Sequence, residues 1–143
     1  MNAEAHILLV EDDEVDIMGM KRALKALKIA NTLHIANDGI QALELLRGQS
    51  DKQKIEFPFI ILLDLNMPRM GGLEFLEEIR NDSELNNSIV FVMTTSSDEQ
   101  DICAAYKKNI AGYIVKSNAQ ESFSKALGLI EHYWRVIELP PKS

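Results

Sequence analysis

Short apolar runs alternate along this chain with longer segments in which apolar residues recur every three or four positions. Three of the runs are almost continuously apolar, which is typical of parallel strands that are covered on both faces. The runs that predict β-strands are "HILLV" (6–10), "TLHIA" (32–36), "FIILL" (59–63), "IVFVM" (89–93) and "GYIV" (112–115).

The segments between these runs predict amphipathic helices. Their apolar stripes are Ile17, Met20, Leu24 and Leu27; Ile40, Leu43 and Leu46; Phe75, Leu76 and Ile79; Ile102 and Tyr106; and Phe123, Leu127, Ile130, Trp134 and Ile137. Strict alternation of strands and helices predicts an α/β fold with one doubly wound, five-stranded parallel sheet and right-handed crossovers. We expect the flavodoxin-like strand order 2-1-3-4-5, with helices on both faces.

The length of 143 residues most simply corresponds to one domain. We expect a single domain over 1–143, with a core over about 5–138 and a short proline-containing tail, 139–143. No DNA-binding or catalytic output domain is expected after the last helix. If the protein signals, it then does so through its own surface.

Composition narrows the class of protein further. Hydrophobic residues make up 46% of the chain and charged residues 26%, which is typical of a globular protein and argues against disorder. The net charge of −7 disfavours binding to nucleic acid or to an anionic membrane surface, and suits a protein that handles cations.

The single cysteine, Cys103, excludes an intramolecular disulfide and fits a reducing compartment. It falls at a helical position that we expect to be partly buried, and no histidine nearby in the sequence would activate it, so we interpret it as structural. The amino terminus lacks the pattern of a signal peptide, and no stretch approaches the roughly 20 apolar residues of a membrane span. We therefore expect a cytoplasmic protein.

Polar groups follow four of the five predicted strands. In an open parallel sheet, the carboxyl ends of the strands form one edge, and ligands bind there at the point where the strand order reverses. These groups are Glu11, Asp12 and Asp13 after the first strand, Asp64 after the third, Thr94 after the fourth and Lys116 after the fifth.

The expected strand order brings Glu11, Asp12 and Asp64 together. Such carboxylates repel one another unless a hard divalent cation joins them, and Mg²⁺ prefers oxygen ligands of this kind. The tight turn after Asp64 also aims the backbone carbonyl of Asn66 at the same point. The sequence therefore predicts a Mg²⁺ site.

On the other side of Asp64, Lys116 supplies a positive charge and Thr94 a hydroxyl. Metal, ammonium and hydroxyl around one carboxylate suit a tetrahedral dianion, as in phosphoryl-transfer sites. Asp64 is the natural nucleophile, because carboxylates form aspartyl-phosphates.

Each residue also has a purely structural interpretation. Acidic residues after a strand commonly cap helices, and a strand-end aspartate often forms a turn. Thr94 or Lys116 alone indicates nothing. The placement of all of them at one edge of the sheet favours the functional interpretation.

The motifs "VEDD", "LLDLNMPRMGG", "VMTTS" and "YIVKS" together resemble the receiver domain of two-component response regulators, over essentially the whole chain. The separations 94 − 64 = 30 and 116 − 94 = 22 are those expected in that family. The resemblance implies a phosphoacceptor signalling protein rather than an enzyme in the ordinary sense, with self-phosphotransfer and autodephosphorylation.

The resemblance also implies individual roles. Asp64 would accept a phosphoryl group from a sensor histidine kinase, Asp12 would bind Mg²⁺ directly and Glu11 would bind it through water. Thr94 resembles the switch hydroxyl and Lys116 the charge partner of the phosphoryl group. Two further positions complete the set: Asp13 would be an N-cap or outer-shell acid, and Tyr113 resembles the aromatic switch residue that repacks the surface of the fourth helix, fifth strand and fifth helix.

One position departs from the family pattern. The family usually has Lys-Pro with a cis peptide bond, whereas this chain has Lys116-Ser117. A cis bond before serine costs roughly 2.5–4 kcal/mol, more than before proline. Either the fold supplies that strain or the loop is rearranged.

The last helix carries a second apolar stripe beside the first, formed by Ala126, Leu129, Tyr133 and Val136. Two adjacent stripes exceed what a surface helix normally buries. One interpretation is a wide core-facing surface. The other is a partner or homodimer interface, with Leu129, Tyr133, Trp134 and Val136 as candidates, because aromatic residues are favoured at interface cores.

A narrower resemblance concerns single-domain regulators paired with bacterial and cyanobacterial phytochromes. The shared features are the long loop before the third strand, "TTS", "KS" in place of "KP", and the aromatic last helix ending in "ELPP". They imply a phytochrome-type kinase as partner, with an unidentified protein downstream.

Other functions compete with this interpretation. A phosphorelay intermediate and a degenerate receiver that acts as a scaffold are the alternatives within the family. A Mg²⁺-dependent phosphatase of the haloacid dehalogenase type would need a second acid where Asn66 stands. An FMN-binding flavodoxin needs a phosphate-cradling loop after the first strand, where this chain has "EDDEVD".

Overall fold

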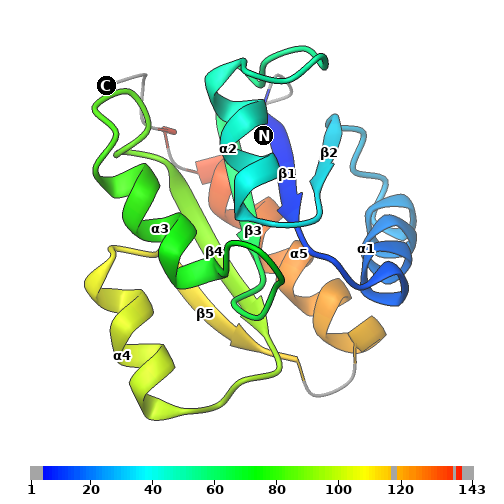
Figure 1. Cartoon of the computed structure of the whole chain (residues 1–143). Helices are drawn as coiled ribbons and strands as arrows, with labels where there is room; N and C mark the ends of the chain where they lie inside the picture. Colours follow the sequence, from blue (N-terminus) through cyan, green and yellow to red (C-terminus); the bar gives the residue numbers. More distant parts are fainter. Residues whose placement is uncertain (1–4, 117–118, 137, 140–143) are drawn as a thin grey trace.

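The computed structural model describes residues 5–116, 119–136 and 138–139, without the side chains of 119–123 and 134–136. Strands and helices alternate along the whole chain, as Figure 1 shows. The elements are β1 (His6–Val10), α1 (Glu14–Ala26), β2 (Leu33–Ala36), α2 (Gly39–Arg47), β3 (Phe59–Leu63), α3 (Gly72–Arg80), β4 (Ile89–Thr94), α4 (Glu99–Lys107), β5 (Gly112–Val115) and α5 (Ala119–Val136).

The five strands form one parallel sheet in the order β2-β1-β3-β4-β5. In its register Val10 of β1 pairs with Leu63 of β3, so the residues that follow these two strands leave the sheet side by side. The predicted fold class and strand order are confirmed. Two strand boundaries differ from the expected ones by a single residue, since β2 begins at Leu33 and β4 extends to Thr94.

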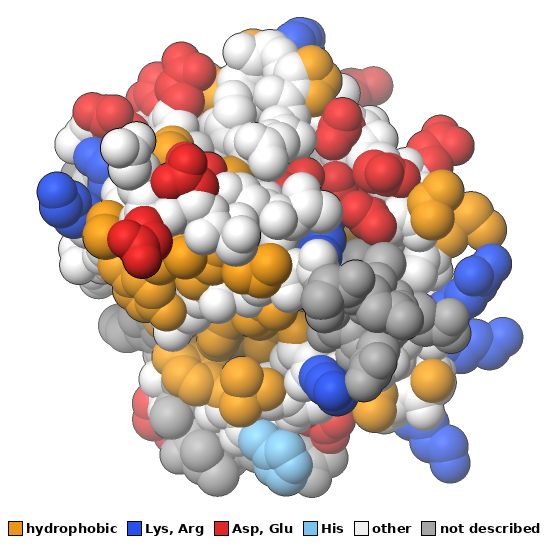
Figure 2. All heavy atoms as spheres, turned by 90° about the horizontal axis from the view of Figure 1, so that it is seen from below, with side chains coloured by type: hydrophobic (Ala, Val, Ile, Leu, Met, Phe, Trp, Pro, Cys, Tyr) orange, Lys and Arg blue, Asp and Glu red, His pale blue; other side chains and the backbone are white. Residues whose placement is uncertain are grey.

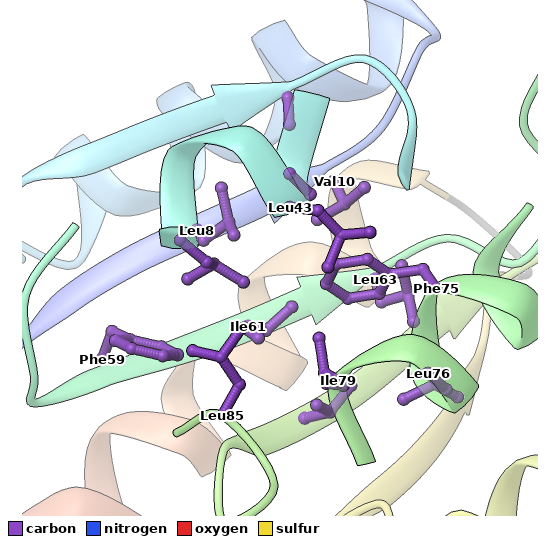
Figure 3. Packing of buried hydrophobic residues seen from close by; sticks show 14 of the residues in the cluster. Leu8, Val10, Leu43, Phe59, Ile61, Leu63, Phe75, Leu76, Ile79 and Leu85 are labelled. Atoms are coloured by element: carbon purple, nitrogen blue, oxygen red, sulfur yellow. The ribbon is translucent and has the colours of Figure 1, made fainter. Parts of the chain in front are cut away.

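One face of the sheet packs against α2, α3 and α4, and most of its core side chains are aliphatic. Leu8 and Ile61 of the sheet meet Leu43 of α2 and Phe75 of α3 in this layer, which Figure 3 shows from close by. The other face packs against α1 and α5, with Leu62 and Phe91 among its buried residues. Because successive residues of a strand point to opposite faces, both layers need apolar side chains, and β3 is buried along its whole length.

Aspartates begin three of the helices. Asp13 caps α1, its side chain accepting hydrogen bonds from the amides of Val15 and Asp16. Asp38 caps α2 and Asp98 caps α4 in the same manner. These carboxylates accept hydrogen bonds from amide groups that have no partner within their helix. Each cap therefore fixes the residue at which its helix begins.

Three expectations about burial are wrong. Ile40 is 37% exposed and Tyr106 is 49% exposed, because α2 and α4 turn Ala42 and Ala105 toward the sheet instead. Cys103 also lies on the exposed side of α4 rather than partly buried. A stripe of apolar residues shows that a helix has a buried face, but a short helix with several apolar residues does not show which stripe that is.

The second apolar stripe of α5 divides between two environments. Ala126 belongs to the core together with Leu127 and Ile130, whereas Leu129 is 60% exposed. The side chains of Phe123, Trp134 and Val136, and the whole of Ile137, lie outside the described residues. Within the described part of the chain, no helix has the length and apolar character needed to cross a membrane.

Candidate functional site

Three carboxylates meet where β1 and β3 end. One oxygen from each of Glu11, Asp12 and Asp64 lies within 4.8 Å of the other two. The sheet fixes two of them, because the Asp64 amide donates to the carbonyl of Val10 (3.0 Å) and the Glu11 amide donates to that of Ala36 (2.9 Å). The gathering predicted from strand order is therefore present. Figure 2 views the molecule from this side and shows acidic side chains grouped on one part of the face.

The turn after Asp64 depends on a close approach between two stretches of backbone. The amide of Gly72, at the start of α3, donates to the carbonyl of Leu65 (2.9 Å). A Cβ atom at Gly72 would lie 2.7 Å from the carbonyl oxygen of Asp64, closer than such atoms can approach. The glycine thus lets α3 begin directly beneath the strand end. The Asn66 amide lies 3.5 Å from Asp64 Oδ1, while the predicted role of the Asn66 carbonyl stays a prediction.

A second connection ties this turn to α2. The guanidinium of Arg69 donates to Asp38 Oδ2 at 2.6 Å, and the amide of Gly39 donates to the carbonyl of Met70 at 3.0 Å. Arg69 is mostly exposed and Asp38 is buried. The hydrogen bonds from Arg69 and Gln41 lower the pKa of Asp38 although burial opposes them. The segment that follows Asp64 is therefore held at both of its ends.

Glu11 is the most strongly perturbed acid of the group. Burial raises the pKa of Glu11 to about 7, the hydrogen bond from Lys116 lowers it in part, and the charge of Asp64 raises it again. At neutral pH, without a cation, this carboxyl is therefore shared between its neutral and ionised forms. An environment that resists a further negative charge is one that a cation would stabilise.

Lys116 lies inside the molecule beside these acids, with only 5% of its side chain exposed. Its Nζ donates to Glu11 Oε1 at 2.6 Å and to Asp16 Oδ2 at 2.9 Å. Burial acts to lower the pKa of Lys116, but these hydrogen bonds and the charges of Glu11 and Asp64 outweigh it and raise that pKa. The lysine is thus held as a cation. The Lys116–Ser117 peptide, for which the sequence leaves two possibilities, extends outside the described residues.

Asp16 is the site residue that the sequence analysis missed. It lies in the first turn of α1, where its carboxylate accepts a hydrogen bond from Lys116. No motif in the sequence distinguishes it from Glu14, the other acid of that turn. Asp13, by contrast, is confirmed as the N-cap of α1 rather than as a member of the three-carboxylate group.

Thr94 ends β4 and is fully buried. Ser96 connects the segment after it to two other elements: its hydroxyl donates to Asp101 of α4 (2.7 Å), and its carbonyl accepts from the Tyr113 hydroxyl (2.9 Å). The Ser96 amide also lies 3.5 Å from Thr94 Oγ1. A displacement of Thr94 would therefore reach both α4 and β5 through one residue.

The donor set fits a hard divalent cation. Three carboxylates of one charge within 4.8 Å repel one another, and the charge of Asp64 adds to burial in raising the pKa of Glu11. Oxygen ligands in this number suit Mg²⁺ or Mn²⁺ better than metals that prefer nitrogen or sulfur. Glu11, Asp12 and Asp64 are the residues that would hold it.

A shallow apolar groove lies between β4 and α5. It has a volume of about 400 Å³ and is lined by Phe91, Ala111, Leu129, His132 and Tyr133. The ring of Tyr133 packs edge-on against that of Phe91, with centroids 5.5 Å apart. Of the four interface candidates on α5, Leu129 is exposed and Tyr133 is partly buried, and the side chains of Trp134 and Val136 lie outside the described residues.

Comparison with known proteins agrees with this fold and this pocket. The chain matches the family model of the response regulator receiver domain over residues 7–128, and it belongs to that family. It is 36% identical to the response regulator Rcp1 of Synechocystis sp. over 135 residues, which cover 94% of this chain and 92% of that protein.

Two solved structures resemble it over nearly the whole of both chains. The Mn²⁺-bound form of Rcp1 has a TM-score of 0.84 at 35% identity, and covers 95% of this chain and 99% of its own. The phosphorylated cyanobacterial phytochrome response regulator RcpA has a TM-score of 0.87 at 34% identity, with coverage of 96% and 99%. The predicted resemblance to receivers of the phytochrome-associated kind is therefore confirmed.

Proposed function

We propose that this protein is a response regulator that accepts a phosphoryl group on Asp64 in a Mg²⁺-dependent reaction. The observation that carries the proposal is the group of Glu11, Asp12 and Asp64 at the strand ends, with the buried ammonium of Lys116 beside Glu11. A cation site next to a fixed positive charge suits the transfer of a phosphoryl group, which depends mainly on positioning and charge stabilisation.

In the proposed step, a carboxylate oxygen of Asp64 attacks the phosphorus of a phosphohistidine. The new O–P bond forms as the P–N bond breaks, the imidazole leaves with the bonding electrons, and Asp64 becomes a mixed anhydride of carboxylic and phosphoric acids. A divalent cation held by Glu11, Asp12 and Asp64 would supply charge neutralisation for the phosphoryl oxygens. Lys116 is the positive charge that the protein itself supplies. Water later hydrolyses the anhydride.

Output in this proposal begins at Thr94, whose hydroxyl binds the new phosphoryl group. Ser96 would transmit the change, because it is bonded to Asp101 of α4 and to Tyr113 of β5. The phosphoryl group thus biases a two-state equilibrium of the α4, β5 and α5 surface, and Tyr113 is the aromatic residue that repacks.

A sensor histidine kinase is the proposed donor, and the names of the relatives favour one of the phytochrome type, since RcpA is a phytochrome response regulator and AtBRR a bacteriophytochrome response regulator. The exposed face of α5, with Leu129 beside the apolar groove, is the proposed surface for a homodimer or a downstream protein. A phosphorelay intermediate would use the same Asp64 chemistry and differ only in the next acceptor.

The deciding experiment is intact-mass measurement after incubation with Mg²⁺ and phosphoramidate or acetyl phosphate. We expect one added phosphoryl group on the wild type, and none on Asp64→Asn or without Mg²⁺. Asp51→Asn, which removes an exposed acid from the loop before β3, is the matched control and should be modified like the wild type. Absence of modification with several donors would overturn the proposal and favour a scaffold.

Size-exclusion chromatography of the same samples tests the output surface. If α5 forms a homodimer, Leu129→Glu should abolish the dimer while leaving phosphoryl incorporation unchanged, because a charge at an apolar interface core is strongly disfavoured. An unchanged elution volume for this variant would exclude α5 as the dimer interface.

A further inference from the structure

Among the described residues, the ammonium of Lys116 donates to two carboxylates that belong to different parts of the molecule. Glu11 is a member of the three-carboxylate group, whereas Asp16 is not. Both side chains are shielded from solvent, Glu11 at 4% and Asp16 at 18% exposure. The ammonium therefore lies at the border between the cation pocket and the first turns of α1.

We infer that Asp16 is a positioning residue. It holds the ammonium of Lys116 when the Glu11 carboxylate pairs with a divalent cation instead of with the lysine. The inference rests on the proposed function, since it concerns the same pocket. It assigns to α1 a part in the site that the three-carboxylate group does not include.

The reason is a conflict of charge at Glu11. The same carboxylate pairs with Lys116 and faces Asp12 and Asp64, so a cation among the three acids competes with the ammonium for it. A buried ammonium left without a partner is costly, and a nearby dication repels it. Without the carboxylate of Asp16, Lys116 would therefore oppose cation binding at Glu11.

Asp16 removes that conflict. Its Oδ2 lies 2.9 Å from Nζ, and it approaches the ammonium from α1 rather than from the strand end. The cap at Asp13 fixes the first turn of α1 by accepting from the amides of Val15 and Asp16, and so fixes the backbone that carries the Asp16 carboxylate. Lys116 can then give up Glu11 and still keep an anionic partner.

Glu14 provides a matched comparison. It is another acid of the first turn of α1, it is exposed, and it contributes the same general attraction for a cation and the same interaction with the helix dipole. If Asp16 acted only through its charge at a distance, removing either acid would have a similar effect. If Asp16 acts through Lys116, removing Asp16 weakens cation binding more than removing Glu14 does, and this excess disappears when the lysine is absent.

The test measures Mg²⁺ affinity by titration calorimetry at pH 8 for wild type, Asp16→Asn and Glu14→Gln, each with Lys116 and with Lys116→Met. We expect Asp16→Asn to weaken Mg²⁺ binding at least threefold more than Glu14→Gln does. In the Lys116→Met background that excess should vanish. Asp16→Glu, which restores a carboxylate, should recover part of the affinity.

Two outcomes would overturn the inference. One is equal weakening by Asp16→Asn and Glu14→Gln, and the other is an excess that persists without Lys116, which would mean that Asp16 acts on the cation directly. Because Mg²⁺ binding is measured without a phosphoryl donor, failure of the proposed function appears separately, as a wild type that binds Mg²⁺ but gains no mass. A wild type that binds no Mg²⁺ would overturn both.

Discussion

Two cations, Lys116 and Arg80, are partly or wholly buried at opposite ends of the sheet, and their partners differ in kind. Lys116, at the carboxyl ends of the strands, is paired with the carboxylates of Glu11 and Asp16. Arg80, at the end of α3, donates to four backbone carbonyls. These are the carbonyls of Asn86, Ser88, Lys108 and Asn109, at distances between 2.7 and 3.1 Å.

The difference appears in the charge balance of the two groups. Burial lowers the pKa of Arg80, and no carboxylate of the described residues forms an ion pair that would offset it, whereas the carboxylates around Lys116 raise the pKa of that lysine. Carbonyls do not change charge, so Arg80 joins the loops before β4 and after α4 permanently. Glu11, one partner of Lys116, can gain a proton or a cation. A fixed neutral partner suits a structural cation, and a partner of variable charge suits one that takes part in a reaction.

The largest effect is expected from Lys116→Ala, which leaves Glu11 and Asp16 without their cation. We expect the free energy of unfolding to fall by about 3 kcal/mol at pH 8 in the absence of Mg²⁺. The loss should be smaller at pH 6, because a Glu11 carboxyl with a pKa of about 7 then carries a proton and needs no partner. Urea unfolding at both pH values measures this, and equal losses would contradict the proposed charge balance.

The direction of this pH dependence follows from the raised pKa of Glu11. In the folded protein that pKa lies near 7, above its ordinary value of 4.5. The stabilisation linked to the proton is complete below about 4.5 and is lost as pH rises through about 7. Wild-type stability should therefore carry a component from Glu11 that declines over this interval, and Glu11→Gln should remove it.

Arg80→Ala should destabilise the protein by about 2–3 kcal/mol, because several carbonyls lose a charged donor at once. In contrast to the lysine variant, this loss should be the same at pH 6 and pH 8. Phosphoryl incorporation per folded molecule should not change. Arg80→Lys keeps the charge but not the fork of donors, so its stability should lie between that of the wild type and that of Arg80→Ala. A loss that varied between these pH values would weaken the distinction between the two cations.

Asp38→Ala is expected to cost about 1 kcal/mol, through loss of the cap on the Gln41 amide. Arg69→Ala removes the ion pair but keeps the cap, and because Arg69 is exposed its effect should be smaller and should shrink as salt is added. Chemical denaturation of both variants at low and high ionic strength separates the contributions. Equal destabilisation by the two variants would mean that the ion pair, and not the cap, holds α2.

The smallest effect concerns His34, near the end of the sheet that carries Arg80. His34 Nε2 lies 3.0 Å from His6 Nδ1, and burial together with the charge of His6 lowers the pKa of His34 below its ordinary 6.5. Its stabilising contribution is complete above about 6.5 and is lost as pH falls through the lower folded value. His34→Gln should lose less stability than the wild type between pH 7 and 5, with no change in the pH profile of phosphorylation.

The sequence predicts the pocket well because its members need only strand order to meet. Continuous apolar runs such as 59–63 identify buried parallel strands, and the residue after each run must then lie at one edge of the sheet. Asp64 follows from this argument without any knowledge of side-chain contacts.

The partners of the two cations were harder to predict. Asp16 lies 100 residues from Lys116, and only the rotation of α1 relative to the sheet brings them together. The carbonyls around Arg80 carry no sequence signal, because every residue has one. The exposure of Ile40 and Tyr106 does not follow from the sequence for a related reason: apolar spacing fixes the period of a helix but not its rotation.

Three carboxylates within 4.8 Å of one another also make folding and chemistry thermodynamically linked. Any cation that binds the native pocket and not the unfolded chain adds to the apparent stability, and above its dissociation constant the gain grows with the logarithm of its concentration. The melting temperature, measured as a function of cation concentration, therefore reports binding at the site. This measurement needs neither a kinase nor a phosphoryl donor. On the proposed function, the pocket that holds Asp64 is then also the place where divalent cations add to the stability of the fold.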